Sequence, residues 1–140
     1  MPQPATRVRP TGHPGYSETL PREPESATAA RRLVRVALSA WGLDDLAPDA
    51  ALIVTELVSN AVRHARREYI RVVVDRPGPA QVRLGVVDFS QVQPVRGQPD
   101  PERESGCGLV LVEELAERWG TDPLPYGKRV WADLRGRGER

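Results

Sequence analysis

TELVSNAVRHA, residues Thr55–Ala65, lies in the most regular helical pattern of this chain. Apolar residues recur there at spacings of three and four, and Pro48 suits the first turn of a helix. The pattern predicts a helix from Pro48 to about Arg66. Its apolar face is broad and comprises Ile53, Val54, Leu57, Val58, Ala61, Val62 and Ala65.

The same helix carries polar residues at helical spacing. Glu56 and Asn60 are four apart and therefore share one face, with His64 four residues further along. Thr55, Ser59 and Asn60 each favour a helix less than alanine does, by up to about 0.7 kcal/mol. Folding alone gives little reason to place them there, although a solvated helix face is the plainer interpretation of the Glu56/Asn60 pair by itself.

A second amphipathic helix is predicted upstream. Apolar residues recur at three and four over residues 29–40, Ser26 suits the N-cap, and Gly42 suits the position just beyond the helix end. Before it, residues 16–20 alternate too briefly to separate an edge strand from extended coil, so the two remain equal alternatives.

Strand patterns and one more helical pattern follow. Residues 69–75 (YIRVVVD) and 81–87 (QVRLGVV) predict an antiparallel hairpin, because proline and glycine lie between them. Residues 109–119 have helical spacing that Gly120 would end, and residues 128–134 (KRVWADL) alternate as a last strand. This order predicts an α+β fold, a two-layer α/β sandwich with helices on one face of a mixed or antiparallel sheet.

Composition excludes several classes of protein. The chain has 140 residues, 39% hydrophobic and 28% charged, which is typical of one globular domain. Lysine and arginine number 20 against 19 acidic residues, so no basic excess points to nucleic acid. Cys107 is the only cysteine, which excludes an intrachain disulfide. We find neither a secretory signal nor a membrane-spanning stretch and expect a cytoplasmic protein with no membrane partner.

The chain divides into three predicted parts. Residues 1–15 are proline-rich and expected to be flexible, residues 16–135 form the domain, and residues 136–140 form a short tail. Inside the domain, residues 88–105 show no periodicity. A loop of this length is usually functional or mobile, and we interpret it as a candidate lid.

Two further features have the chemistry of a ligand site. Asp88 follows a strand, where its carboxylate could accept a hydrogen bond from a ligand amino group or, more commonly, cap a turn. Gly106 and Gly108 flank Cys107 directly before Leu109, where backbone N–H groups at the start of a helix could bind phosphate. Each feature alone is weak evidence. Their order along the chain, after the Glu56/Asn60 helix, is more specific.

Four stretches together resemble the GHKL ATPases, and most closely their anti-sigma-factor kinase branch. The stretches are TELVSNAVRHA (55–65), VVDFS (86–90), SGCGLVLVEELAERWG (105–120) and GKRVWADL (127–134). The resemblance extends over about residues 16–134. It implies a Bergerat-type (histidine-kinase-like ATPase) α/β sandwich that binds ATP and magnesium.

The resemblance also implies roles for individual residues. Asn60 would coordinate Mg²⁺, for which an amide oxygen is a suitable ligand, and Glu56 would be the catalytic general base. Asp88 would bind the adenine amino group. Gly106 and Gly108, with the N–H groups from Leu109 onward, would hold the phosphates.

This chain departs from the family pattern at two places. After Asp88 the pattern D-x-G-x-G has glycines where this chain has Ser90 and Val92, which implies an altered adenine pocket and lid and a modest nucleotide affinity. Cys107 stands where arginine is frequent, and its plain interpretation is a buried thiol, with a redox-sensitive site as the alternative. His64 and Lys128 receive no role from the resemblance.

Two functions follow from the resemblance and remain open. The first is a serine/threonine kinase that phosphorylates an antagonist protein, the anti-anti-sigma factor, and sequesters a sigma factor. The second is an ATP-binding interaction module of the same fold that transfers no phosphate. The resemblance also implies a possible homodimer. A nucleic-acid-binding domain is disfavoured by the balanced charge.

Overall fold

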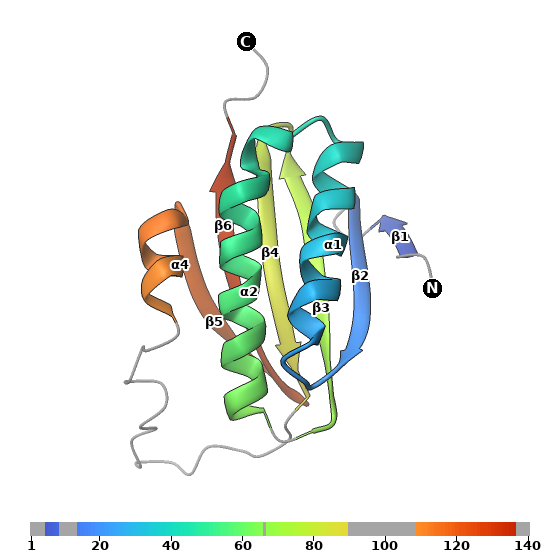
Figure 1. Cartoon of the computed structure of the whole chain (residues 1–140), viewed down its shortest axis with the longest axis vertical. Helices are drawn as coiled ribbons and strands as arrows, with labels where there is room; N and C mark the ends of the chain where they lie inside the picture. The colour runs from blue at the N-terminus through green and yellow to red at the C-terminus, as the bar shows by residue number, and fades with distance from the viewer. Residues whose placement is uncertain (1–4, 9–13, 66, 90–108, 137–140) are drawn as a thin grey trace.

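The computed structural model describes residues 5–8, 14–65, 67–89 and 109–136, which form one sheet and a layer of helices (Figure 1). The strands are β1 (Ala5–Val8), β2 (Pro14–Pro21), β3 (Tyr69–Gly78), β4 (Gln81–Asp88), β5 (Arg118–Leu124) and β6 (Gly127–Arg135). The helices are α1 (Ser26–Ala40), α2 (Ala47–His64) and α4 (Val110–Leu115), with a short 3₁₀ turn, Asp44–Leu46, before α2.

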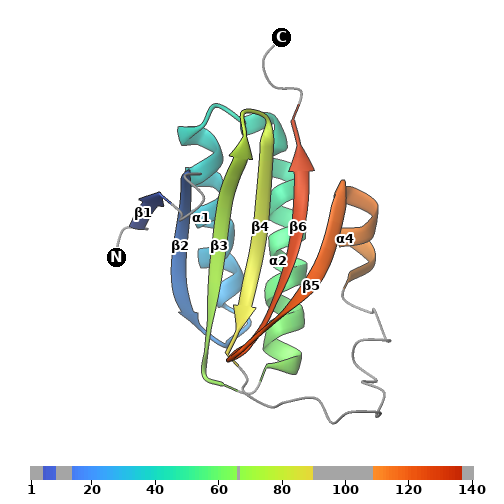
Figure 2. The same ribbon diagram turned by 180° about the vertical axis from the view of Figure 1, so that it is seen from behind.

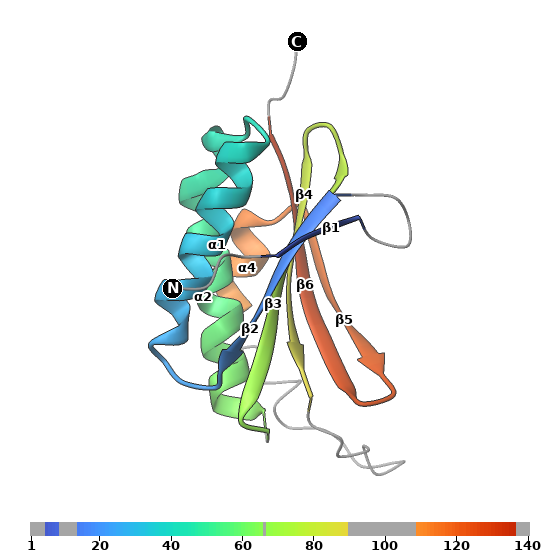
Figure 3. The same cartoon turned by 90° about the vertical axis from the view of Figure 1, so that its right-hand side faces the viewer.

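The sheet is antiparallel throughout its described strands, in the order β1-β2-β3-β4-β6-β5. Figure 3 shows α1, α2 and α4 together on one face of it, and Figure 2 shows that no described helix lies on the other face. The predicted two-layer α+β sandwich is confirmed, with an antiparallel sheet. No helix in the described part of the chain is long and apolar enough to cross a membrane.

The core lies between the two layers. In β4, Val82, Leu84 and Val86 are buried in it, and the intervening residues lie on the opposite face of the sheet, as the two-residue period of a strand requires. The helices contribute apolar residues at three- and four-residue spacing, all fully or almost fully buried: Ala30, Leu33, Val34, Ala37 and Leu38 from α1, and Ile53, Val54, Leu57 and Val58 from α2.

Both long helices occur where the sequence predicts them. α2 has Pro48 in its first turn and extends to His64, and the Ala65 N–H donates to the Ala61 carbonyl at 2.7 Å. Beyond the end of α1, Gly42 has a φ of 70°, the left-handed conformation that favours glycine. The predicted N-cap at Ser26 is wrong. Glu25 occupies that position, and the Ser26 hydroxyl donates to the Pro21 carbonyl at 2.6 Å instead.

The predicted helix over residues 109–119 is wrong beyond Leu115. The backbone becomes extended at Ala116, the Glu117 N–H donates to the Asp133 carbonyl at 2.7 Å, and β5 begins at Arg118. Trp119 still packs against the core, from a strand. The helical spacing therefore correctly predicts that Trp119 packs against the core, but it predicts the wrong secondary structure for this residue.

Gly120 does not end a helix. It pairs with Trp131 across the β5–β6 ladder, and a Cβ on it would lie 2.9 Å from the Trp131 ring. The residue is glycine because the indole ring occupies the space where a side chain would begin.

The N-terminal strand at residues 16–20 is present and longer than predicted. It is part of β2, which pairs with β3 on one side and β1 on the other, so it is not at the sheet edge. The sequence pattern does not predict β1, which lies within the segment expected to be flexible. The predicted domain boundaries stay predictions, and the candidate lid falls outside the described residues from position 90 onward.

Candidate functional site

Glu56 and Asn60 of α2 lie on the flank that faces away from α1. Arg31 of α1 donates from Nη1 to Thr55 Oγ1 at 3.1 Å, which fixes the α1 side of the helix. Each residue turns a helix by about 100°, so Glu56 and Asn60 are rotated from Thr55 toward the opposite flank. Figure 1 shows α2 between α1 and α4, and α4 packs against α2. Glu56 and Asn60, both half-buried, therefore lie on the α4 side.

Asp88 is the last residue of β4 and is only 4% exposed. It continues the series Leu84 and Val86 at the strand period, so its side chain lies on the helix-covered face of the sheet. Its neighbours in the ladders are Ile70 of β3 and Lys128 of β6. A nearly buried carboxylate at the end of a central strand, under the helices, is a suitable group for binding a polar ligand atom.

Four of the predicted site residues belong to elements that lie near one another at one corner of the sandwich. β4 ends beneath the C-terminal half of α2, and α4 begins beside that half (Figure 1). Glu56 and Asn60 belong to the C-terminal half of α2, Asp88 is the last residue of β4, and Leu109 directly precedes α4. Gly106, Cys107 and Gly108 lie outside the described residues, so their predicted contacts stay predictions.

The corner offers oxygen donors for a hard cation but no complete protein cage. Among the described residues, no three histidine, cysteine, aspartate or glutamate side chains cluster as metal ligands. Mg²⁺ usually keeps several waters and binds one or two protein oxygens together with substrate phosphates. The Asn60 amide oxygen on this flank of α2 fits that mode of binding.

The turn between β5 and β6 contacts the end of β4, and the sequence pattern does not predict this contact. A Cβ on Gly127 would overlap the carbonyl oxygen of Asp88, and the rings of Phe89 and Tyr126 stack with centroids 5.8 Å apart. The GKRVWADL stretch contains Gly127, but a pairing with Asp88 requires the tertiary structure.

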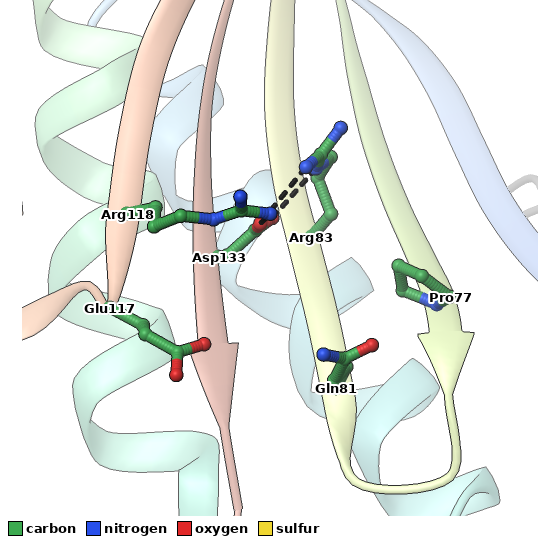
Figure 4. A pocket seen from close by; sticks show the side chains of 6 residues that line it. All are labelled: Pro77, Gln81, Arg83, Glu117, Arg118 and Asp133. Atoms are coloured by element: carbon green, nitrogen blue, oxygen red, sulfur yellow. Dashed lines mark hydrogen bonds and ion pairs between the residues drawn. The ribbon is translucent and has the colours of Figure 1, made fainter.

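A separate polar cluster lies on the helix-free face of the sheet. Figure 4 shows the residues that line a pocket there, in which Arg83 donates to both carboxylate oxygens of Asp133 at 2.6 and 2.9 Å and Arg118 donates to Asp133 at 3.1 Å. Burial opposes ionisation of Asp133, but these hydrogen bonds outweigh it and hold the pKa of Asp133 below its ordinary value. The hydrogen bond to Asp133 also raises the pKa of Arg83. None of the predicted site residues lines this pocket.

The protein is an α/β sandwich with helices on one face of its sheet. Its candidate site consists of polar residues on a long helix and at the end of a central strand. Residues 20–132 match the family of the histidine kinase-like ATPase domain, and the chain belongs to that family. No curated protein matches the chain. The family confirms the resemblance to GHKL ATPases and implies ATP binding, whereas the anti-sigma-factor branch stays a prediction.

Proposed function

We propose that this protein is an ATP-dependent serine/threonine kinase that phosphorylates an antagonist protein and sequesters a sigma factor. The observation that carries the proposal is the position of Glu56 and Asn60 on one flank of α2, above the corner where β4 ends at the nearly buried Asp88. Membership of the histidine kinase-like ATPase family supports ATP as the ligand of that corner.

Each residue of the corner has one role in this proposal. The Asn60 amide oxygen binds Mg²⁺, which supplies positive charge to the phosphates when bound. The Asp88 carboxylate accepts a hydrogen bond from the adenine amino group. Leu109 and its preceding glycines, Gly106 and Gly108, donate backbone N–H groups to phosphate oxygens.

Glu56 is the general base of the proposed phosphate transfer. Its carboxylate accepts the proton of a serine or threonine hydroxyl on the antagonist protein, and the hydroxyl oxygen then bonds to the γ-phosphorus as the bond to ADP breaks. The half-buried position of Glu56 leaves its carboxylate within reach of a partner that docks at the corner.

Calorimetric titration with ATP tests the binding part of the proposal. We expect binding that depends on magnesium, and loss of that dependence in Asn60→Ala because the amide ligand is removed. Ser59→Ala is the matched control, since Ser59 is also half-buried on α2 but lies toward its solvent side. Absence of ATP binding by the unmodified chain would contradict the proposal.

A second candidate function is a protein-interaction module. In it the same corner binds ATP, and the protein binds its partners but transfers no phosphate to them. The specific observations in its favour are Ser90 and Cys107, which stand where the kinase pattern has glycine and commonly arginine. Tight ATP binding without phosphate transfer to the genuine antagonist protein would favour this module. A homodimer is part of either proposal, and sedimentation of the purified chain would test it.

A further inference from the structure

Gly127 holds the backbone at the end of β4 in close contact. It is the first residue of β6 and follows the two-residue turn Pro125–Tyr126. A Cβ on Gly127 would overlap the Asp88 carbonyl oxygen and would lie 3.1 Å from the Cα of Phe89. The atoms in conflict are backbone atoms, so a side chain at this position requires the Asp88–Phe89 peptide to move.

A second contact joins the same two segments one residue further along. The Phe89 and Tyr126 rings are stacked, with centroids 5.8 Å apart and planes inclined by 25°. Offset-stacked rings at this separation attract one another. Phe89 follows Asp88 and Tyr126 precedes Gly127, so the turn contacts the chain at Asp88 and directly after it.

The direction of the Asp88 side chain depends on this backbone. Asp88 forms the last rung of the β4 ladders, opposite Lys128 and Ile70, and the strand has no further rung to hold it in register. A change of one residue in register would turn a side chain to the other face of the sheet. The two contacts from the β5–β6 turn lie where the ladder ends.

We propose that Tyr126 and Gly127 are positioning residues that hold the Asp88 carboxylate for nucleobase recognition, and thereby determine selectivity for adenine. This inference rests on the proposed ATP site. Adenine presents an amino group at C6, which can donate to a carboxylate, whereas guanine presents a carbonyl oxygen there, which the carboxylate repels. A displaced Asp88 loses this discrimination, while binding of phosphates at the other end of the site is unchanged.

The test compares the affinities of ATP, GTP and inorganic tripolyphosphate for the full chain in magnesium-containing buffer. We expect the unmodified chain to prefer ATP over GTP. Gly127→Ala and Tyr126→Ala should each weaken ATP by about tenfold, which corresponds to one charged hydrogen bond, and bring the ATP/GTP ratio toward one. Binding of tripolyphosphate should not change. Tyr126→Phe retains the aromatic ring, so it should keep the ATP/GTP ratio of the unmodified chain.

Two matched controls separate positioning from general destabilisation. Gly120→Ala crowds the Trp131 ring in the same β5–β6 hairpin, but away from Asp88. Tyr69→Ala removes an aromatic ring that is 53% exposed at the start of β3, near the same end of the sheet. Both should keep the ATP/GTP ratio of the unmodified chain even if the melting temperature falls.

The outcomes distinguish this inference from the function on which it rests. An unmodified chain that binds no ATP overturns the ATP site and the inference with it. Unchanged ATP/GTP ratios in both Gly127→Ala and Tyr126→Ala, alongside a reduced ratio in Asp88→Asn, overturn the inference alone. An equal reduction of ATP and tripolyphosphate binding would also overturn it, since that result indicates a structural role.

Discussion

Asp133 keeps its negative charge in a position that is only 8% exposed because two guanidinium groups hydrogen-bond to it. Arg83 is held in turn against the Trp131 ring, with its Cζ 4.1 Å from the ring centroid. A nearly buried carboxylate without such donors would favour its neutral form. The cluster thus stabilises the helix-free face and is independent of the corner that carries the proposed site.

Asp133→Ala should lower the free energy of unfolding at pH 7 by about 1.5–3 kcal/mol, because charged hydrogen bonds are lost. The pKa of Asp133 is lowered in the folded state from its ordinary value of 3.8. Its stabilising contribution is therefore present above that value and is lost as pH falls through the folded pKa. Urea denaturation at pH 7 and at successively lower pH measures this difference.

The control for this prediction is Asp122→Ala. Asp122 also pairs with an arginine, Arg129 at 2.7 Å, but its side chain is 43% exposed. Exposed pairs contribute about 1 kcal/mol or less, so this change should cost little. A destabilisation by Asp133→Ala that stays constant from neutral pH down through the folded pKa would contradict the assigned electrostatic origin.

Glu56→Gln should reduce phosphate transfer to the antagonist protein by about 10²–10⁴-fold, the usual contribution of a positioned base. The amide keeps the size of the side chain but cannot accept the hydroxyl proton, so ATP affinity should change little. A radiolabelled phosphate-transfer assay measures the rate, and Glu113→Gln on the exposed side of α4 serves as the control. Equal rates in the Glu56 variant and the unmodified chain would assign the base elsewhere.

At the scale of elements, β5 is where helix and strand patterns conflict. Val112, Leu115 and Trp119 are spaced for a helix and all pack in or against the core, but α4 ends at Leu115 and β5 pairs with β6 from Arg118. Periodicity reports which residues are buried, and a strand that follows a short helix can bury the same position. Only the pairing with β6, which is a long-range contact, decides between the two.

Gly120→Ala tests the strand assignment energetically. In the strand, the added methyl group meets the Trp131 ring, so we expect a loss of about 1–3 kcal/mol in unfolding free energy, typical of overpacking. Combined with Trp131→Leu, which removes the ring, the same change should cost less. Denaturation of the two single variants and the double variant measures the coupling. A cost that is independent of Trp131 would contradict the contact between Gly120 and that ring.

The elements of the site could be predicted to different extents. Spacing alone brings Glu56 and Asn60 to one face of α2, as the structure has them. The sequence predicts Asp88 directly after a strand, and the structure makes it the last residue of that strand. Gly127 and Tyr126 could not be predicted as neighbours of Asp88, because their contacts cross from one hairpin to another. Likewise, Ser26 matches an N-cap by residue type, but its hydroxyl bonds to Pro21 across a turn.

At the scale of the whole molecule, the two faces of the sheet differ in what they carry. The helix-covered face carries the core and, at its end, the proposed ATP corner, whereas the other face is held by ion pairs such as Arg83–Asp133 and Arg129–Asp122. The corner joins α2, β4 and α4, elements far apart in sequence. A ligand bound there would therefore stabilise the native arrangement of the entire sandwich against unfolding.

ATP with magnesium at about one hundred times its dissociation constant should raise the free energy of unfolding by about 2.7 kcal/mol, since only the folded corner binds it. Urea denaturation with and without the nucleotide measures the increase. Asp133→Ala should be less stable without nucleotide, but ATP should raise its free energy of unfolding by the same amount, because the Asp133 cluster lies on the other face of the sheet. Asn60→Ala should lose the part of the increment that depends on magnesium. An increment that vanishes in Asp133→Ala but persists in Asn60→Ala would place the ligand on the helix-free face instead.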